Sequence, residues 1–139
     1  MTRVADQRIQ VPPNCELTLG MSCVDKSRPG RTVWRMRADE RFANPAGIVQ
    51  GGFVGAMADS AMGSATVTFA REQGRKVFSS NVEMKTSFLA PVQVGAVLVC
   101  TATVVSGGAR VAFAEAQVVD DRGTTVARAS STYLFTERE

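Results

Sequence analysis

The sequence contains no histidine among its 139 residues, and it has only three cysteines. Without histidine the chain cannot form a Ser-His-Asp triad, a histidine metal site or a histidine general base. Any hydrolytic chemistry must therefore come from carboxylates, hydroxyls, amides and backbone dipoles. The cysteines are odd in number and show no CxxC spacing, so we expect reduced thiols and no metal site.

Long apolar runs and clustered charge are also missing. No segment approaches the roughly 18 apolar residues of a membrane span, and the first residues lack the apolar core of a signal peptide. We therefore expect no membrane contact and a cytoplasmic location. Aromatic residues make up 6% of the chain and the net charge of +3 is scattered along it, which disfavours nucleic acid as a partner. The mild positive excess suits a small anionic ligand, but an ordinary basic surface explains it equally well.

The length and the ordinary globular composition predict one domain with a single core, over residues 1–139. Residues 1–14 are expected to form an N-terminal arm, because Pro12 and Pro13 prevent regular strand pairing. Turn residues, β-branched runs and a small-residue helix mark the remaining elements. The sequence predicts strands near 16–24 and 31–38, a helix over 51–72, and strands over 76–89, 95–105, 109–119 and 124–135.

The last strands are joined by short turns at 106–108 and 120–123, which predicts an antiparallel meander. The fold class is therefore α+β, with one long helix on a curved antiparallel sheet of about five or six strands. In the strand over 109–119, one face is expected to carry Ala112, Ala114, Ala116 and Val118. A single open sheet leaves edge strands, which are usually paired or covered in native proteins. We therefore expect a homodimer with a continuous sheet.

The predicted helix begins after Gln50, with two glycines in its first turn. The first N–H groups of a helix have no partner within the helix, and the helix dipole adds partial positive charge there. Gly51 and Gly52 would let a ligand oxygen approach this backbone closely. These are the properties of an oxyanion hole, although many helices begin with glycine for other reasons.

Asp59 is a carboxylate in the middle of this helix, on a stripe of small residues. Its neighbours at helical spacings of three, four or seven residues are Gly52, Gly55, Ala56 and Gly63. Small residues along one line indicate that something approaches the helix closely there. Asp59 either acts on a ligand at this place or bonds a backbone amide or an arginine of a packed strand.

The spacing between Gly51 and Asp59 makes a further prediction. Eight residues of helix span about 12 Å, so one reacting carbonyl cannot contact both residues of the same helix. If both act on one substrate, they come from two copies of the helix that run antiparallel across a dimer interface. Catalysis would then require the dimer.

The segment NPAGIVQGGFVGAMAD, residues 44–59, resembles the motif of the hotdog-fold acyl-CoA thioesterases, in particular the PaaI-type group. That family carries N-P-x-G-x-x-H-G-G, followed by a helix with an acidic residue nine positions after the histidine. The later segments NVEMKTSFLAPVQVG and GGARVAFAEAQVVDDRGTTVARASSTYLF also resemble this family, and the resemblance spans about residues 16–136. The residues that match the motif are Asn44, Pro45, Gly47, Gly51, Gly52 and Asp59.

The resemblance implies a helix wrapped by an antiparallel sheet, in dimers and often tetramers. It also implies hydrolysis of coenzyme A thioesters without a metal or a bound organic cofactor. Asp59 would be the general base for water or the nucleophile, and the Gly51 N–H would polarise the thioester carbonyl. Asn44 would help to position the carbonyl or the water. Asn81 falls where relatives often have a serine or threonine that helps to hold water.

Gln50 departs from the family pattern, because most relatives have histidine at this position. Glutamine can still donate a hydrogen bond to a thioester carbonyl or to a backbone group, but it does not titrate near neutral pH. The absence of histidine also disfavours the reaction of the hotdog dehydratases. Among the basic residues, Arg110 is the best candidate to contact the phosphates of coenzyme A, and its alternative is an exposed hairpin charge. Lys85 and Arg128 are weaker candidates.

Three functions therefore remain open for this sequence. The favoured one is an acyl-CoA thioesterase that acts as a homodimer or homotetramer. The second is a hotdog protein that binds acyl-CoA without hydrolysing it, in which Gln50 marks lost catalysis. The third is a structural domain that binds a protein partner. Neither the acyl group nor the pathway can be read from the residues.

Overall fold

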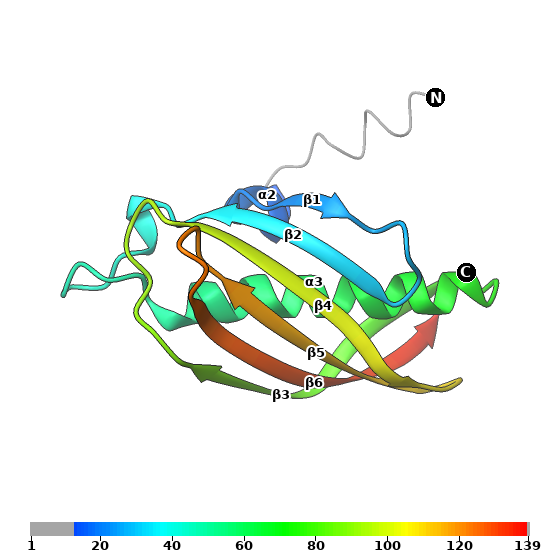
Figure 1. Ribbon diagram of the computed structural model, residues 1–139. Coiled ribbons are helices and arrows are strands. Elements are labelled where there is room, and N and C mark those ends of the chain that lie inside the picture. Colours follow the sequence, from blue (N-terminus) through cyan, green and yellow to red (C-terminus); the bar gives the residue numbers. More distant parts are fainter. Residues whose placement is uncertain (1–12, 139) are drawn as a thin grey trace, which may run out of the picture.

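The computed structural model describes residues 13–138 of the chain. Within these residues a long helix, α3 (Gly51–Glu72), is enclosed by a six-stranded antiparallel sheet with the strand order β1-β2-β4-β5-β6-β3 (Figure 1). The strands are β1 (Ser22–Asp25), β2 (Arg31–Arg37), β3 (Val77–Phe88), β4 (Val97–Gly107), β5 (Val111–Val119) and β6 (Thr125–Glu137). The predicted α+β class and the predicted helix are confirmed. No helix in the described part of the chain combines the length and the apolar character needed to cross a membrane.

The core lies between α3 and the concave side of the sheet. The helix contributes residues that recur at helical spacing, among them Val54, Met57, Ala61 and Met62, all of them buried. The sheet contributes small residues that alternate along β5, and the predicted face of Ala112, Ala114, Ala116 and Val118 is buried. Because these side chains are short, the sheet can curve closely around the helix.

The predicted strand over residues 16–24 is wrong in its first half. Residues Cys15–Leu19 form a short helix, α2, and the strand begins only at Ser22. The Asn14 side chain accepts a hydrogen bond from the Leu17 N–H at 3.0 Å, and Gly20 ends the helix with a φ of 73°. This local capping outweighs the apparent strand pattern of the segment. The predicted arm over 1–14 lies outside the described residues, apart from its last two positions.

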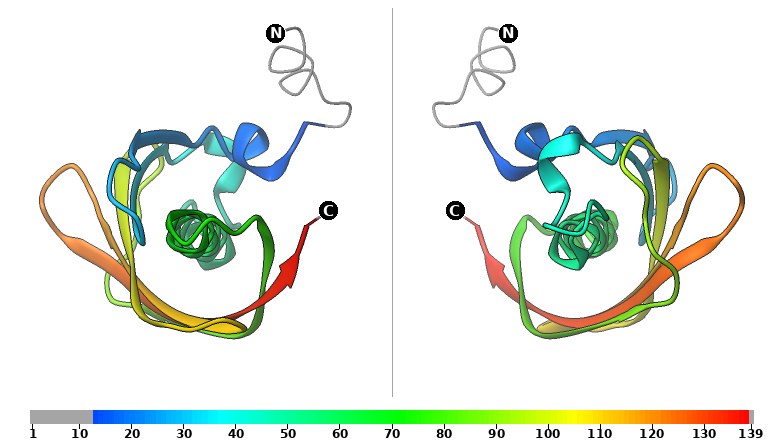
Figure 2. Two further views of the ribbon diagram at one scale, coloured as in Figure 1. Left: turned by 90° about the vertical axis from the view of Figure 1, so that its right-hand side faces the viewer. Right: turned by 90° about the vertical axis from the view of Figure 1, so that its left-hand side faces the viewer.

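One side of α3 is left uncovered by the sheet. The views along the helix show the sheet curving around α3, with an opening between α2 and the edge strand β3 (Figure 2). Among the described residues, β1 and β3 are the two edges of the sheet, and β3 pairs with β6 alone. The opening therefore lies beside a long edge strand.

The edge strand β3 contains a β-bulge that changes which of its residues face the helix. Its register with β6 shifts between Asn81 and Glu83, which leaves Val82 as an extra residue. The Ser131 hydroxyl of β6 donates a hydrogen bond to the Glu83 carbonyl at 2.6 Å and so holds the bulge. The side toward α3 carries Val77, Ser79 and Asn81 before the bulge, and Met84, Thr86 and Phe88 after it. A regular strand could not present both sets, because its side chains alternate strictly.

Candidate active site

Asp59 lies on the uncovered side of α3, and its carboxylate is held by two side chains of the sheet. Its Oδ1 accepts hydrogen bonds from the Tyr133 hydroxyl at 2.7 Å and from the Asn81 side-chain amide at 3.0 Å. The Tyr133 hydroxyl also lies 3.0 Å from the Asp59 main-chain carbonyl oxygen. Among residues 13–138, none donates a hydrogen bond to Oδ2. The two oxygens of this carboxylate therefore have different surroundings.

Tyr133 and Asn81 come together because they are register partners on neighbouring strands. Directly opposed residues of an antiparallel pair have their side chains about 5 Å apart on one face of the sheet. Asn81 faces α3 just before the bulge. The bulge lets the same strand also place Phe88 against the helix start, which a regular strand could not do. The sheet thus delivers two hydrogen-bond donors to one turn of the helix.

Tyr133 is 2% exposed and is the only tyrosine of the chain. Its burial raises the pKa of its hydroxyl well above the usual value, and the hydrogen bond to Asp59 raises that pKa further. The hydroxyl consequently stays protonated at neutral pH and acts as a donor. Sequence reasoning missed this residue. The signal that could have found it is a lone tyrosine on the inward face of a strand. A buried tyrosine hydroxyl usually has a hydrogen-bond partner.

A pocket of about 510 Å³ opens beside Asp59, between α3 and β3. Its walls carry mostly hydroxyl and charged groups, and the lining includes Ser64, Ser80, Lys26 and Arg71. Asp59 and Tyr133 both lie on this lining. A water molecule or a small polar group can therefore reach the carboxylate.

The start of α3 is built differently, around glycine and apolar side chains. A Cβ on Gly51 would lie 3.1 Å from two ring atoms of Phe88, whereas nothing lies within 4 Å of the corresponding position on Gly52. Close packing thus favours glycine at position 51, while nothing in the described chain requires it at position 52. Gly51, Val54, Phe88 and Val126 line a second, mainly apolar pocket of about 390 Å³.

The exposed Gln50 occupies the N-cap position of α3, but its side chain makes no capping hydrogen bond. Its backbone N–H donates to the Phe42 carbonyl at 2.8 Å, and the Phe42 and Phe53 rings stack with centroids 4.4 Å apart. These contacts attach the preceding loop to the first turn of the helix. Because the exposed Gln50 side chain makes no capping hydrogen bond, its amide group is available to a ligand.

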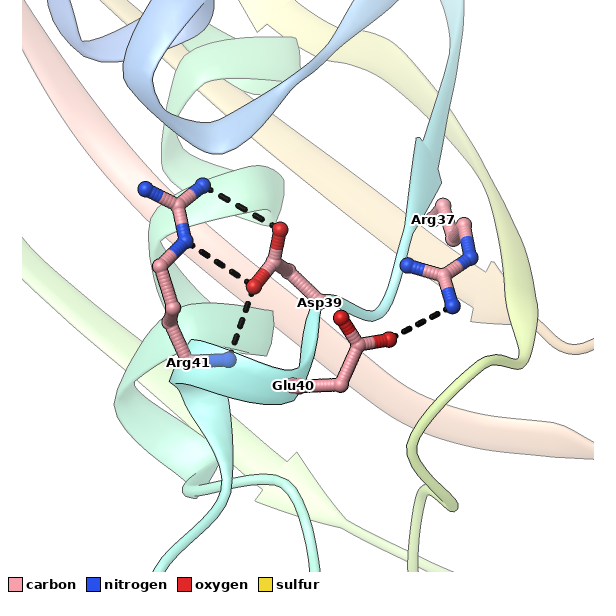
Figure 3. Close-up of polar contacts among 4 residues, drawn as sticks. All are labelled: Arg37, Asp39, Glu40 and Arg41. Carbon is pink, nitrogen blue, oxygen red and sulfur yellow. Dashed lines mark hydrogen bonds and ion pairs between the residues drawn. The ribbon is translucent and has the colours of Figure 1, made fainter.

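The loop before the helix is shaped by charge pairs and by Asn44. Asp39 is the N-cap of the short helix η1 (Glu40–Phe42) and accepts hydrogen bonds from the Arg41 backbone N–H and guanidinium, while Arg37 pairs with Glu40 (Figure 3). Asn44 Oδ1 accepts hydrogen bonds from the backbone N–H groups of Ala46 at 2.9 Å and Ile48 at 3.2 Å. The Asn44 oxygen thus folds its own loop, and its side-chain nitrogen donates no hydrogen bond to another residue within 13–138.

The candidate residues form two separate groups within one chain. Asn81 and Tyr133 lie at Asp59, whereas Asn44, Gln50 and Gly51 lie at the helix start, about 12 Å away along α3. The structure does not bring the two groups together in a single chain.

The basic candidates lie away from Asp59. Arg110 is exposed in the turn between β4 and β5, and Gly107 of the same hairpin packs against the Phe69 ring, ten residues further along α3 than Asp59. Lys85 and Arg128 line a pocket of about 290 Å³ together with Glu115 and Ser130, and the Arg128 guanidinium donates to Gln117 at 3.1 Å. Within residues 13–138, no group of three or more Cys, Asp or Glu side chains is arranged to hold a metal ion.

A long helix wrapped by a curved antiparallel sheet, with a carboxylate in mid-helix, defines a hotdog-fold protein of the thioesterase type. Residues 46–127, more than half of the chain, match the family model described as thioesterase superfamily. The chain belongs to the thioesterase superfamily, a family of thioester hydrolases. The family resemblance read from the Asn44–Asp59 motif is confirmed.

Named relatives agree with this assignment. The chain is 28% identical over 100 residues to human acyl-coenzyme A thioesterase 13, which covers 72% of this chain and 69% of that protein. Its fold is similar to that of the E. coli PaaI protein from the phenylacetic acid degradation operon, with a TM-score of 0.82, 20% identity and coverage of 96% and 90%. It is also similar to smu.793 from Streptococcus mutans bound to acetyl CoA, with a TM-score of 0.77, 18% identity and coverage of 94% and 95%.

Proposed function

We propose that this protein hydrolyses a coenzyme A thioester to a free acid and coenzyme A, with a homodimer as the active form. The observation that carries the proposal is the Asp59 carboxylate, with Oδ1 bound to two donors and Oδ2 without a donor among residues 13–138. The pocket beside it gives a water molecule access to this carboxylate. The acyl-CoA thioesterase relative and the structural neighbour with bound acetyl CoA support coenzyme A thioesters as the substrate class.

Two routes are open to the carboxylate. As a general base, Asp59 takes a proton from water while the water oxygen attacks the thioester carbonyl carbon. As a nucleophile, Asp59 attacks that carbon itself and forms an anhydride, which water then hydrolyses. In both routes the carbon–sulfur bond breaks and the coenzyme A thiolate leaves, to be protonated afterwards. The carbonyl oxygen becomes negative and needs fixed donors.

The start of a second copy of α3 is the proposed source of these donors. The Gly51 N–H of the partner chain would bind the carbonyl oxygen, and Gly52 would leave room for the substrate. Asn44 and Gln50 would position the carbonyl or the attacking water. Arg110 is retained as a candidate for the coenzyme A phosphates, although it lies far from Asp59 of its own chain.

The edge strand β3 supports the dimer. One side of β3 has no partner strand within residues 13–138, and Phe78 and Val82 on it are 60% and 63% exposed. A long edge strand with exposed apolar side chains is usually covered in a native protein. Antiparallel pairing of β3 with its copy would continue the sheet and place the two α3 helices side by side in opposite directions. A homotetramer would need a further interface, and a cytoplasmic location stays a prediction.

A thiol-release assay over short, long and aromatic acyl-CoAs tests the proposed function. We expect the unmodified protein to release coenzyme A, and Asp59→Asn to lower kcat by about a hundredfold or more. Glu72→Gln is the matched control, because it makes the same change on an exposed residue of the same helix. It should leave kcat unchanged. An Asp59→Asn protein with the original kcat would contradict the proposed chemistry.

The second candidate function is binding of acyl-CoA without hydrolysis, and Gln50 in place of the family's histidine favours it. In that case acyl-CoA would bind to the protein in a titration, yet no thiol would be released from any member of the panel. The same assay therefore separates the two functions.

A further inference from the structure

We propose that Tyr133 is a positioning residue for the reaction: it fixes the Asp59 carboxylate so that Oδ2 is the oxygen presented to the water or the substrate. This inference rests on the proposed function and deepens it. The Asn44–Asp59 motif that carries the family resemblance does not include Tyr133, and the role follows from the contacts of its hydroxyl.

The geometry at Oδ1 shows which atom receives the Tyr133 proton. A tyrosine hydroxyl has one proton to donate, and the shorter of its two contacts is the one to Oδ1, at 2.7 Å against 3.0 Å for the main-chain oxygen. Hydrogen bonds to a charged acceptor are shorter and stronger than neutral ones. The proton of Tyr133 therefore belongs to Oδ1, where the Asn81 amide is the second donor.

Two donors on one oxygen favour a single orientation of the Asp59 carboxylate. The terminal torsion of an aspartate side chain is broad and roughly two-fold, so a free carboxylate exchanges its oxygens easily. With Tyr133 and Asn81 both directed at Oδ1, one orientation is favoured. In this orientation Oδ2 is left without a donor among residues 13–138 and is available as the base or the nucleophile.

Tyr133 is itself held firmly within the sheet. The side chain is 2% exposed, and its strand β6 lies between β5 and β3 in the sheet. Ser131, two residues before it on the same inward face, holds the β3 bulge through the Glu83 carbonyl. Because a reacting group must be held within a fraction of an ångström of its productive position, a tyrosine in the interior of the sheet is better placed for this than one on a loop.

A purely structural role is the alternative for a buried hydroxyl bonded to a helix, and Thr32 provides the matched control. The Thr32 side chain is fully buried, and its hydroxyl donates at 2.8 Å to the carbonyl of Ala61, two residues after Asp59 on α3. Thr32→Val and Tyr133→Phe each remove one buried hydroxyl that contacts the same stretch of helix. Only Tyr133→Phe removes a donor from the carboxylate.

The test compares kcat, KM and the melting temperature for the unmodified protein, Tyr133→Phe, Thr32→Val and Asp59→Asn. We expect Tyr133→Phe to lower kcat by about tenfold to a hundredfold, the range that corresponds to one lost hydrogen bond to a charged group, with KM changed less than about twofold. Thr32→Val should keep kcat even if it lowers the melting temperature. An unchanged kcat in Tyr133→Phe would overturn the role of Tyr133, as would equal losses of kcat in Tyr133→Phe and Thr32→Val.

The outcome for Asp59→Asn separates this inference from the proposed function. If Asp59→Asn loses activity and Tyr133→Phe does not, the proposed function stands and the positioning role falls. If Asp59→Asn keeps full activity, both fall together.

A second measurement covers the case in which Tyr133→Phe does not fold. The chain has one tyrosine, so biosynthetic labelling with fluorotyrosine places a single fluorine next to the Tyr133 hydroxyl. We expect its ¹⁹F resonance to shift in Asp59→Asn and to stay unchanged in Glu72→Gln. An identical resonance in all three proteins would show that the hydroxyl does not bond the carboxylate, and would overturn the role.

Discussion

At the scale of single residues, Asp59 and Tyr133 form a pair: the hydroxyl donates a hydrogen bond to the carboxylate, and the carboxylate raises the pKa of the hydroxyl. The carboxylate receives a short hydrogen bond from the hydroxyl at 2.7 Å. The hydroxyl is buried beside a negative charge, and both conditions raise its pKa. Tyr133 is thus a proton donor to Asp59 at neutral pH.

The ionisation of Tyr133 gives a direct test of this pair. In the unfolded chain the tyrosine titrates near pH 10, whereas in the folded chain its pKa is raised by burial and then by Asp59. The contribution of Tyr133 to the free energy of unfolding is therefore complete below pH ~10 and falls as the pH rises above it, because the unfolded chain then loses its proton first. The ultraviolet absorbance of tyrosinate, recorded during an alkaline titration, measures this residue alone.

We expect the folded protein to show no tyrosinate near pH 10, and the same protein in urea to titrate there. A native midpoint equal to the one in urea would contradict the buried hydrogen bond between Tyr133 and Asp59.

Not every residue of the site could be predicted from the sequence. Asp59 was predicted because an acid among glycines and alanines is unusual, and Asn81 was predicted from its place in the family pattern. Tyr133 was not predicted, because its contact depends on the register between β3 and β6 and on a bulge at Val82. Nothing in the local sequence indicates that bulge.

At the scale of elements, the first turn of α3 carries the second half of the proposed site. Gln50 has a φ of −64° and a ψ of 131°, which is the backbone conformation that a residue before proline prefers. Gly51 is the first residue of the helix, a position that accepts proline well. Proline can therefore replace Gly51 and remove its N–H while the helix start keeps its backbone conformation.

The comparison of Gly51→Pro with Gly51→Ala tests the role of this N–H in the thiol-release assay. Both substitutions add a Cβ close to the Phe88 ring, which is 55% exposed and has room to move. Gly51→Ala keeps the N–H, whereas Gly51→Pro removes it. We expect Gly51→Pro to lower kcat by about a hundredfold, the effect of losing one oxyanion donor, and Gly51→Ala to lower it much less. Equal losses in the two variants would mean that crowding at Phe88 matters and the N–H does not.

The elements differ in how well the sequence predicts them. The bounds of α3 follow from Gly51-Gly52 at its start and Gln73-Gly74 at its end, and the structure has the same bounds. The helix α2 was not predicted, because five residues are too few for a periodic pattern and its stability comes from the Asn14 and Gly20 caps. Arg110 was assigned to a strand, but it lies in the turn before β5.

At the scale of the whole molecule, the proposed reaction requires the two groups of candidate residues to meet across an interface between two chains. Gly51 and Asp59 are about 12 Å apart on one helix. Within residues 13–138 one side of β3 has no partner strand, and this strand carries the exposed Phe78 and Val82. The sequence predicted this division from helix geometry alone. The partner chain was predicted from this spacing, from the edges of an open sheet and from the family resemblance, but no local pattern shows which surfaces of the two copies would meet.

In the proposed dimer, each site takes Asp59 from one chain and the Gly51 N–H from the other. Mixing Asp59→Asn with Gly51→Pro under conditions of subunit exchange tests this shared site. A mixed dimer then contains one site with both groups intact and one site with neither. Since half of the dimers in an equal mixture are mixed, about a quarter of the original sites should be restored.

Two differently tagged copies would verify the exchange, and the thiol-release rate would be measured before and after mixing. We expect two nearly inactive proteins to recover about a quarter of the original activity when they exchange subunits. A mixture that exchanges completely and stays as inactive as its parents would contradict the shared site.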